Sequence, residues 1–516
     1  MRIKIKKTGS FKHSAKYLKL IEDAKVYDVA LKTPITFAPN ISQKEKNKIY
    51  LKREDLQPVF SFKNRGAYNK IINLNDKQKR SGVIAASAGN HAQGVAVSCK
   101  ALKIECLIVM PVTTPEIKVK AVKRHGAKIL LHGDNYDAAA GHANELIEQH
   151  GMTYIHPFDD PDIIAGQGTV GMEILRQLPG KLDAIFIAVG GGGLCAGVAA
   201  YVKYVRPGVK IIAVESDDAA CLDAAMKAGK RVRLKEVGIF ADGTAVAEVG
   251  KETFRILKDL VDEVITVSTD EICAAIKDVY NDTRAICEPS GAMGAAGLKK
   301  YVEQHGVVGQ TLLAVQCGAN IDFDRLRYIS ERTEVGEKRE AILAVSLDEK
   351  PGSFRNFCEA LGVRTISEFN YRFSDAKQAQ IFVGLKVTSD EDRFQLIKDL
   401  TQQGYPVSDL TDSEIAKSHI RHMVGGRSPQ VGQEQVFRFE FPERPSALLN
   451  FLIQLGDGLN ISMFHYRNHG SAFGKVLVGF QASKKDGLEV KGFLDDLGYP
   501  YEDETNNEAY QFFLGS

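Results

Sequence analysis

The 516-residue chain contains no tryptophan, and only 8% of its residues are aromatic. Its charges nearly cancel, with 67 Lys and Arg against 65 Asp and Glu, so it lacks the positive field of a nucleic-acid-binding protein. None of its eight cysteines forms a C-x-x-C pair, which argues against a zinc or disulfide framework and indicates reduced thiols. We therefore expect a globular, metal-free protein in a reducing compartment.

Signals for membrane insertion or export are also weak. The longest run without a charged residue, 184–202, has Gly190-Gly191-Gly192-Gly193 in its middle, which would break a spanning helix. We expect instead a buried strand, a glycine loop and a helix. Residues 1–21 carry seven Lys or Arg and no acid, without the apolar core of a secretory signal. This segment is expected to be a basic surface arm, and the protein to have no membrane partner.

Between about residues 82 and 320, short apolar runs alternate with stretches of helical character. The runs are apolar on both faces, as in a parallel sheet covered by helices on both sides. The predicted strands are residues 82–86, 106–110, 128–131, 153–155, 184–189, 210–214, 263–267 and 312–315. We expect an α/β region with mostly parallel sheets, arranged in two lobes over residues 1–330.

The chain changes character after residue 330 and then repeats itself. Residues 349–351 recur at 443–445 and residues 366–372 at 461–467, an offset of 94 and then 95 residues. Each copy has the element order of a ferredoxin-like α+β unit. We expect a linker at 331–338, a first unit at 339–415, a linker at 416–434 and a second unit at 435–516. Neither unit holds a catalytic constellation, so we expect a regulatory pair; a dimerisation module that binds no ligand is the alternative.

The strongest local signal of catalysis is Ser61-Phe62-Lys63-Asn64-Arg65-Gly66-Ala67. A lone lysine is ordinarily a solvated surface cation. Lys63, however, follows small or apolar residues and precedes an Arg-Gly-Ala turn into a helix. Burial at a helix start would lower the pKa of its amine and make it a nucleophile for Schiff-base formation.

Two strand-to-helix junctions are candidate anion sites. At Ser87-Ala88-Gly89-Asn90-His91, exposed backbone N–H groups suit a carboxylate, although an ordinary N-cap by Ser or Asn is the alternative. At Gly190 to Leu194, four consecutive glycines are costly unless the backbone approaches another group closely. We favour a phosphate there over a tight turn without a ligand.

The segment Gln316-Cys317-Gly318-Ala319-Asn320 follows the last predicted strand. A buried cysteine is usually a small apolar residue, but ligands of α/β proteins bind at the carboxyl ends of strands. No Walker A motif occurs. Gly166-x-Gly168-x-x-Gly171 matches the dinucleotide fingerprint but does not directly follow a strand, so we do not interpret it as a nucleotide site.

Together and in this order, these motifs resemble those of the fold-type II pyridoxal-phosphate enzymes, and the chain is most similar to the threonine deaminase (threonine ammonia-lyase) family. The resemblance runs from about Tyr27 to the C-terminus. It includes residues 52–55, 166–169 and 288–292 and the two repeats, which are ACT-like. Serine racemase and serine dehydratase share the catalytic motifs, and the doubled C-terminal region narrows the match.

The resemblance implies that Lys63 forms a Schiff base with pyridoxal 5'-phosphate and is the catalytic residue. The implied cofactor contacts are Phe62 and Asn90 at the ring, Gly190, Gly191, Gly192, Gly193 and Leu194 at the phosphate, and Cys317 at the pyridine nitrogen. Ser87, Ala88, Gly89, Asn90 and His91 are implied to hold the substrate carboxylate. Many relatives have serine in place of Cys317. Because a thiol is a weak donor, the ring nitrogen would stay largely unprotonated, which suits β-elimination over transamination.

The implied reaction converts L-threonine to 2-oxobutanoate and ammonia, the first step of isoleucine biosynthesis. Isoleucine would inhibit the enzyme through the repeats and valine would relieve the inhibition. Candidate effector contacts lie where the repeats are most alike, at Phe369, Tyr371, Arg372, Phe464, Tyr466 and Arg467; shared strand packing is the alternative explanation. The resemblance also implies a cytoplasmic homotetramer.

Two alternatives remain open. An L-serine-directed dehydratase or racemase would share every catalytic motif, because the two substrates differ by one methyl group, worth about 10- to 200-fold in specificity. A catalytically inactive amino-acid sensor would also keep the regulatory repeats, but the intact Lys63 and glycine loop argue against it.

Overall fold

The computed structural model describes residues 12–423, 425–428, 430–431, 434–442, 447–455, 460–467, 473–481, 494–495 and 498–514. The chain folds into two compact units, Met1–Thr333 and Glu334–Ser516.

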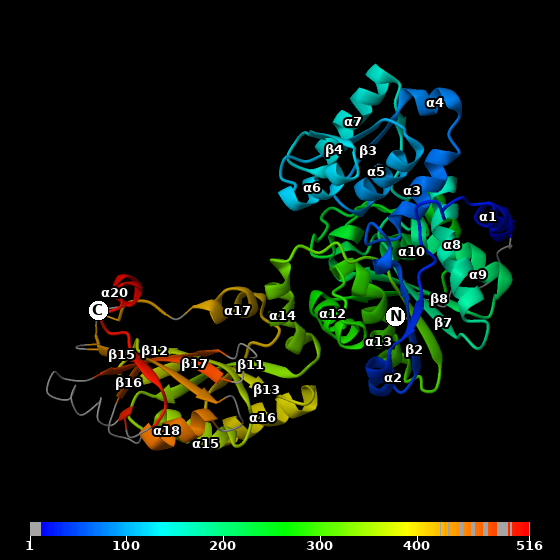
Figure 1. Ribbon diagram of the computed structural model, residues 1–516. Coiled ribbons are helices and arrows are strands. Elements are labelled where there is room, and N and C mark those ends of the chain that lie inside the picture. The colour runs from blue at the N-terminus through cyan, green and yellow to red at the C-terminus, as the bar shows by residue number, and fades with distance from the viewer. Residues whose placement is uncertain are drawn as a thin grey trace. The chain divides into compact units, whose positions relative to one another are not determined.

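The first unit contains two sheets, one in each lobe (Figure 1). The larger sheet has the order β1-β2-β10-β7-β8-β9 and is parallel except for the β1–β2 pair. The smaller sheet, β5-β4-β3-β6, is entirely parallel. The strands are β1 (Ile35–Phe37), β2 (Lys48–Arg53), β3 (Val83–Ala86), β4 (Cys106–Met110), β5 (Lys128–Leu131), β6 (Thr153–Tyr154), β7 (Ala184–Ala188), β8 (Lys210–Ser216), β9 (Glu263–Val267) and β10 (Thr311–Gln316).

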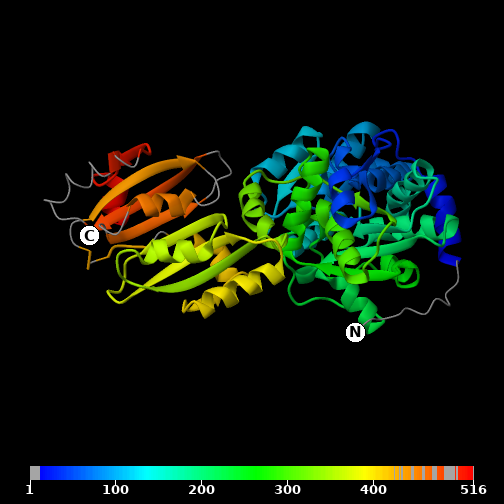
Figure 2. The same ribbon diagram turned by 90° about the horizontal axis from the view of Figure 1, so that it is seen from below.

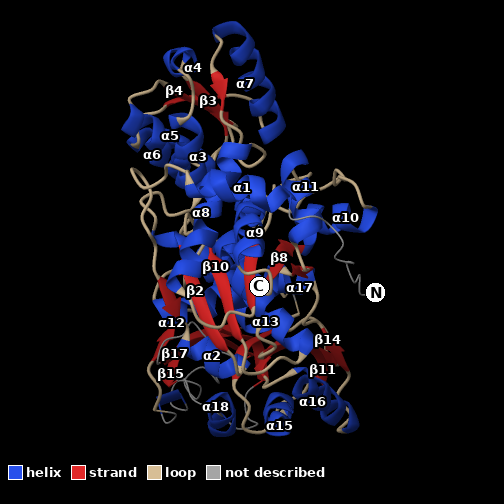
Figure 3. Cartoon of the chain, turned by 90° about the vertical axis from the view of Figure 1, so that its right-hand side faces the viewer, coloured by secondary structure: helices blue, strands red, loops and turns tan. Residues whose placement is uncertain are grey.

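Helices surround both sheets (Figure 3). Strands β3, β7 and β10 are buried along their whole length, as expected when helices cover both faces. The prediction of a two-lobed α/β region with mostly parallel sheets is confirmed. The helices are α1 (Lys12–Glu22), α2 (Pro39–Glu45), α3 (Lys63–Ile72), α4 (Asp76–Ser81), α5 (Asn90–Leu102), α6 (Glu116–Arg124), α7 (Tyr136–His150), α8 (Pro161–Gln177), α9 (Gly193–Val205), α10 (Cys221–Ala228), α11 (Lys251–Leu260), α12 (Thr269–Thr283), α13 (Pro289–His305) and α14 (Arg325–Gly336).

The uncharged run 184–202 forms strand β7, the glycine loop and most of helix α9, as predicted. Every residue from Gly193 to Lys203 is buried, which explains why the helix is apolar on all sides. The described helices include none that is both long and apolar enough to span a membrane.

The expected basic arm at residues 1–21 is wrong for its second half, and residues 1–11 lie outside the described residues. Residues from Lys12 onward form helix α1, in which Tyr17 and Ile21 are fully buried against the core of the larger lobe. Lys16 and Lys19 of the same helix are exposed, so they lie on the face away from the core.

The glycines of the rejected dinucleotide motif lie inside helix α8, where they permit close helix packing. A Cβ at Gly166 would lie 2.7 Å from the backbone oxygen of Arg65 in α3, and one at Gly168 would lie 3.1 Å from that of Gly197 in α9. Helix α8 thus packs closely against both α3 and α9.

The second unit contains one eight-stranded sheet, in the order β14-β11-β13-β12-β16-β17-β15-β18. The two repeats contribute four strands each and join through the antiparallel pair β12–β16 (Figure 2). The strands are β11 (Glu340–Asp348), β12 (Ile366–Arg372), β13 (Gln378–Lys386), β14 (Val407–Asp409), β15 (Glu434–Pro442), β16 (Asn460–Arg467), β17 (Phe473–Gln481) and β18 (Tyr501–Asp503).

Helices α15, α16 and α18 cover one face of this sheet (Figure 1). The expected ferredoxin-like α+β architecture is confirmed, and the predicted second helix of the second repeat, 487–497, lies largely outside the described residues. The described helices of this unit are α15 (Ser353–Leu361), α16 (Asp390–Gln402), α17 (Glu414–Ser418), α18 (Ala447–Leu455) and α20 (Glu508–Phe513).

Both predicted linkers contain regular structure. Residues 331–336 form the end of helix α14, because Arg332 pairs with Asp270 and Thr333 Oγ1 donates to Cys273 O at 3.3 Å, both in helix α12. Within 416–434, residues up to 418 belong to α17, and Ala416 is buried. The charged composition of 331–338 therefore reflects ion pairing on a packed helix and not an extended linker.

Candidate active site

Lys63 is the first residue of helix α3, and its amine lies beside the end of strand β10. The N–H of Phe62 donates to Cys317 O at 3.4 Å. Lys63 Nζ donates a hydrogen bond of 3.0 Å to Pro157 O and lies 5.4 Å from the centroid of the Phe62 ring. The structure therefore brings Cys317, which is distant in sequence, next to the neighbouring residues Phe62 and Lys63.

The environment of Lys63 favours its neutral amine. Burial lowers the pKa of Lys63 to about 8, and this effect outweighs the opposing influence of Cys317 and Glu288. At pH 7 about one amine in ten is then unprotonated and able to attack a carbonyl carbon. A surface lysine would be almost entirely protonated at that pH.

Asn90 begins helix α5 and is held by two side chains that sequence reasoning had not assigned to the site. Its Nδ2 donates to Glu288 Oε1 at 2.6 Å, and its Oδ1 accepts from Asn320 Nδ2 at 2.6 Å. Burial is the main reason why the pKa of Glu288 rises to about 7, and the charge of Asp242 adds to it. Glu288 and Asn320 both belong to segments singled out in the sequence, 288–292 and 316–320, but nothing local indicated a role for either side chain.

The segment Ser87–His91 forms the junction between strand β3 and helix α5. Gly89 is the N-cap residue and provides no side-chain cap, so the first N–H groups of α5 are available to an anion. The Ser87 hydroxyl accepts from Gly89 N–H at 3.3 Å, which shapes the turn. An ordinary Ser or Asn cap, the alternative left open by the sequence, is not formed at this junction.

The imidazole of His91 has a structural contact. Its Nε2 lies 2.8 Å from Ile155 O, at the end of strand β6. Burial and the charge of Lys63 lower the pKa of His91 to about 3, so the ring is neutral. His91 can therefore offer a backbone N–H to a substrate while its side chain stays bound to the smaller lobe.

The loop Gly190–Leu194 is buried throughout, and its glycines permit close contact with other protein atoms. A Cβ at Gly191 would lie 2.2 Å from the ring of Phe158, and one at Gly190 would lie 2.8 Å from the backbone oxygen of Thr244. Gly192 has a φ of +94°, in the left-handed region that favours glycine. The predicted close approach of this backbone to another group is confirmed, and the groups approached are Phe158 and Thr244 of the protein itself.

Helix α9 begins at Gly193, within this segment, without a side-chain cap. Gly192 is its N-cap residue and has no side chain to accept the first N–H groups. A buried helix N-terminus without a cap has the donors and the positive dipole end that bind phosphate. Phe158 packs on this loop and directly follows Pro157, the acceptor for Lys63, so the loop and Lys63 belong to one site.

Cys317 lies at the carboxyl end of strand β10 and remains a thiol. Its Sγ donates to Ser290 O at 3.2 Å, and burial raises the pKa of the thiol. Because its hydrogen already has an acceptor, Cys317 is a weaker donor to a ligand than an unengaged serine hydroxyl would be.

These groups fit pyridoxal phosphate. An uncapped, buried helix start suits its phosphate, and a buried lysine with a lowered pKa suits its aldehyde. The half-buried amide of Asn90 is held in place by Glu288 and Asn320. The fit rests on the donor set of this chain.

The six candidate effector residues lie at the seam between the two repeats. Phe369 is opposite Tyr466 and Tyr371 is opposite Phe464 in the β12–β16 pair, and these four side chains are almost fully buried. The rings of Phe369 and Phe464 have their centroids 5.5 Å apart. Shared strand packing, the alternative left open by the sequence, therefore accounts for the aromatic part of the similarity.

The two arginines of the motif have polar partners in the same unit. Arg372 pairs with Glu434 of the second repeat and donates to Leu514 O at 2.9 Å, next to helix α20. Arg467 lies 3.2 Å from His422 Nδ1. Arg372 thus connects the two repeats, and Arg467 of the second repeat contacts the segment between them.

Comparison with known families gives matches over both units. Residues 26–318 match the family described as "Pyridoxal-phosphate dependent enzyme". Residues 331–420 and 425–514 each match the "C-terminal regulatory domain of Threonine dehydratase". The cofactor prediction and the prediction of two regulatory repeats are confirmed.

Individual relatives match over almost the full length. The biosynthetic L-threonine dehydratase of Burkholderia multivorans is 52% identical over 96% of this chain and 99% of its own. That of Escherichia coli is 51% identical over 97% of each chain. The chloroplastic biosynthetic threonine dehydratase of Arabidopsis thaliana is 49% identical over 98% of this chain and 85% of its own.

Solved structures resemble the catalytic part. The processed form of threonine deaminase isoform 2 from Solanum lycopersicum is 46% identical, with a TM-score of 0.63 over 64% of this chain and 96% of that one. Maize serine racemase is 32% identical, with a TM-score of 0.57 over 60% of this chain and 95% of that one. Catalytic and regulatory matches occur together in the dehydratases, and the chain belongs to the biosynthetic threonine dehydratase family of pyridoxal-phosphate-dependent enzymes.

Proposed function

We infer that this chain is a threonine ammonia-lyase, which converts L-threonine to 2-oxobutanoate and ammonia at the start of isoleucine biosynthesis. The observation that carries the inference is the position of Lys63, a buried lysine with a lowered pKa beside an uncapped helix start and the end of strand β10. The choice of L-threonine as the substrate rests on relatives that match this chain over almost their whole length and are L-threonine dehydratases.

The cofactor is held, in this proposal, by residues from both lobes. The N–H groups of Gly190, Gly191, Gly192, Gly193 and Leu194 bind its phosphate. Phe62 would pack near the ring, Asn90 would contact the ring hydroxyl, and Cys317 would face the pyridine nitrogen. Support comes from the Asn90–Glu288 bond of 2.6 Å, which fixes one N–H of the amide and leaves the other to point at the ligand.

The substrate carboxylate is bound, in this proposal, by the N–H groups of Ser87–His91. Pyridoxal phosphate supplies an electron sink for the charge that develops at Cα. The Lys63 amine removes the Cα proton as a general base, and its lowered pKa keeps this amine competent near neutral pH. Loss of the β-hydroxyl group as water leaves 2-aminocrotonate, which water converts to 2-oxobutanoate and ammonia.

The C-terminal unit provides feedback control, in which isoleucine inhibits and valine relieves the inhibition. Such control requires that an effector bind one state of the protein more tightly than another, by about 1–3 kcal/mol. Arg372 and Arg467 are better candidates for polar effector contacts than the four buried aromatic residues, since their guanidinium groups already lie where the repeats meet.

The direct test measures 2-oxobutanoate release from L-threonine by the full chain, with and without isoleucine, beside a parallel assay with L-serine. We expect threonine turnover that isoleucine suppresses. Turnover unaffected by isoleucine would overturn the regulatory part alone, and turnover of L-serine without L-threonine would move the assignment to a serine-directed enzyme.

We further propose that L-serine is a weaker second substrate and that the enzyme is a cytoplasmic homotetramer. The serine proposal is supported by the likeness of the catalytic part to maize serine racemase. Light scattering of the purified protein tests the tetramer, because a mass other than four times 56.6 kDa would contradict it.

A further inference from the structure

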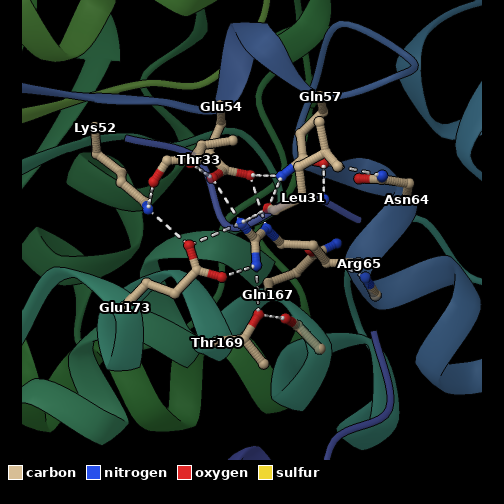
Figure 4. Close-up of polar contacts among 12 residues, drawn as sticks. Leu31, Thr33, Lys52, Glu54, Gln57, Asn64, Arg65, Gln167, Thr169 and Glu173 are labelled. Carbon is tan, nitrogen blue, oxygen red and sulfur yellow. Dashed lines mark hydrogen bonds and ion pairs between the residues drawn. The ribbon is translucent and has the colours of Figure 1, made fainter. Parts of the chain in front are cut away.

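Four buried charged side chains, Lys52, Glu54, Arg65 and Glu173, contact one another in a cluster beside helix α3 (Figure 4). Arg65 Nε donates to Glu54 Oε2 at 2.7 Å, and one of its terminal nitrogens donates to Glu173 Oε1 at 2.7 Å. Lys52 Nζ binds the other oxygen of Glu173 at 2.6 Å. Three chain segments therefore meet here: strand β2 with the short turn after it (Glu54–Leu56), helix α3 and helix α8.

The guanidinium group of Arg65 is completely enclosed. It is fully buried, and its remaining contacts go to Glu54 Oε1 at 2.8 Å, to Leu31 O at 3.0 Å, to Thr169 Oγ1 at 3.1 Å and to Glu173 Oε2 at 3.1 Å. Because each nitrogen of the planar guanidinium group has a partner, the Arg65 side chain is held in a single orientation. The ammonium group of a lysine would not fix its orientation in this way.

The cluster has no net charge, with two cations and two carboxylates. The charge of Arg65 holds the pKa of Glu54 below its ordinary value, so this carboxyl stays ionised although it is fully buried. Buried ion pairs contribute little to stability compared with apolar residues of the same volume. The cluster is therefore better explained by a need to hold these chain segments in one fixed geometry than by a gain in the stability of the fold.

Helix α3 is also held closely by its neighbours at its first turn. A Cβ at Gly94 of α5 would lie 2.9 Å from the carbonyl of Lys63, and one at Gly66 would lie 2.8 Å from Ile163 O in α8. The N–H of Gly66 donates to Gln167 Oε1 at 3.2 Å. The turn that carries Lys63 is thus enclosed between α5 and α8.

Lys63 and Arg65 point to different sides of this turn. Successive residues of an α-helix are about 100° apart, so residues two positions apart point in nearly opposite directions. The Lys63 amine accordingly reaches Pro157 O in the candidate active site, while Arg65 reaches into the charge cluster.

We propose that Arg65, fixed in its fork by Glu54 and Glu173, is the positioning residue for Lys63: it sets the rotation of the first turn of α3 and so the place of the Lys63 amine. The proposal rests on Lys63 being the catalytic lysine. Arg65 itself touches no reacting atom. A misplacement of about 1 Å at a catalytic group costs on the order of 100-fold in rate.

Two variants test the proposal in the full-length holoenzyme. Arg65→Lys keeps the charge but removes the fork, and Glu173→Gln keeps the shape but removes one carboxylate. We expect kcat for L-threonine to fall about 10- to 100-fold in each, with KM changed less than about threefold. We also expect the circular dichroism of the bound cofactor to change, because it reports the orientation of the chromophore and needs no turnover.

Two control variants leave the contacts of the Arg65 guanidinium group with Glu54 and Glu173 in place. Tyr27→Phe removes a bond of 3.0 Å to Glu173 Oε1 at the rim of the cluster. Asp262→Asn disrupts a different buried pair, with Lys203, at the opposite end of the larger sheet. Both should keep the wild-type kcat and cofactor dichroism. Arg65→Lys with wild-type kcat and dichroism per bound cofactor would overturn the proposal, even if the variant were less stable.

Borohydride reduction followed by peptide mass spectrometry separates this proposal from the proposed function. Cofactor trapped at Lys63 in the wild type supports the catalytic assignment whatever the Arg65 variants do. No trapping at Lys63 in the wild type would overturn the catalytic assignment and, with it, the positioning role.

Discussion

The side-chain amide of Asn90 donates a hydrogen bond of 2.6 Å to Glu288 Oε1, although the two residues belong to different lobes of the catalytic unit. The carboxyl group is buried, and its pKa rises to about 7. A carboxyl group with a pKa raised to near neutrality therefore forms part of the contact between the two lobes.

Glu288→Gln should flatten the pH dependence of stability. The folded-state pKa of Glu288 lies above the ordinary value of 4.5, so between these values the folded protein holds a proton that the unfolded chain has released. The contribution of Glu288 to the free energy of unfolding is therefore fully present at low pH. It falls by about 1.4 kcal/mol per pH unit as the pH rises toward 7. Urea unfolding at pH 5, 6 and 7 measures this slope.

The matched control is Glu148→Gln, which changes an exposed carboxyl group on helix α7. It should leave the slope unchanged. A Glu288→Gln variant with the wild-type slope would show that Glu288 titrates as an ordinary carboxyl.

Lys63→Ala should abolish threonine turnover, because both the nucleophile and the general base are removed. We expect kcat to fall by at least about 1,000-fold in a 2-oxobutanoate assay. Lys77→Ala, at an exposed position of helix α4, should retain full activity. Substantial activity in Lys63→Ala would remove the basis of the catalytic assignment.

Gly191→Ala should weaken cofactor binding. Its Cβ would lie 2.2 Å from the Phe158 ring, and relief of such a clash shifts the backbone at a typical cost of about 1–3 kcal/mol. The cofactor content of the purified protein, measured by absorbance, should drop several-fold. Gly180→Ala, where a Cβ would meet open space, should bind cofactor normally; equal content in the two variants would contradict the expected clash.

Phe464→Ala should destabilise the regulatory unit and spare catalysis. The side chain is almost fully buried at the seam of the repeats, and such truncations cost about 3–5 kcal/mol. Calorimetry should show a lower unfolding temperature for this unit. The control Phe394→Ala, at an exposed position of α16, should leave the unfolding temperature unchanged. Unchanged stability with lost isoleucine inhibition would mean that Phe464 contacts the effector directly.

The sequence located the parts of the catalytic site that are local. Lys63 lies at a helix start, and the junction at Ser87–His91 and the glycine loop each connect a strand directly to a helix. Strand and helix periodicity and glycine placement are properties of adjacent residues, so they can be read without knowing the chain's path.

Contacts between distant segments were not predictable in the same way. Glu288 and Asn320 meet Asn90 only after the lobes have packed, and the charge of Arg65 is indistinguishable in the sequence from that of a surface arginine. Its burial depends on Glu54 and Glu173, which arrive from two other elements.

By itself, the sequence determined the fold class, the doubled C-terminal unit and the identity of the candidate catalytic lysine, because these follow from local periodicity, internal repetition and short motifs. Only the tertiary structure decided that β12 pairs with β16 to join the repeats into one sheet and that Arg65 anchors the turn bearing Lys63. Register and burial are set by which surfaces pack together, and side chains far apart in the chain acquire those neighbours only on folding.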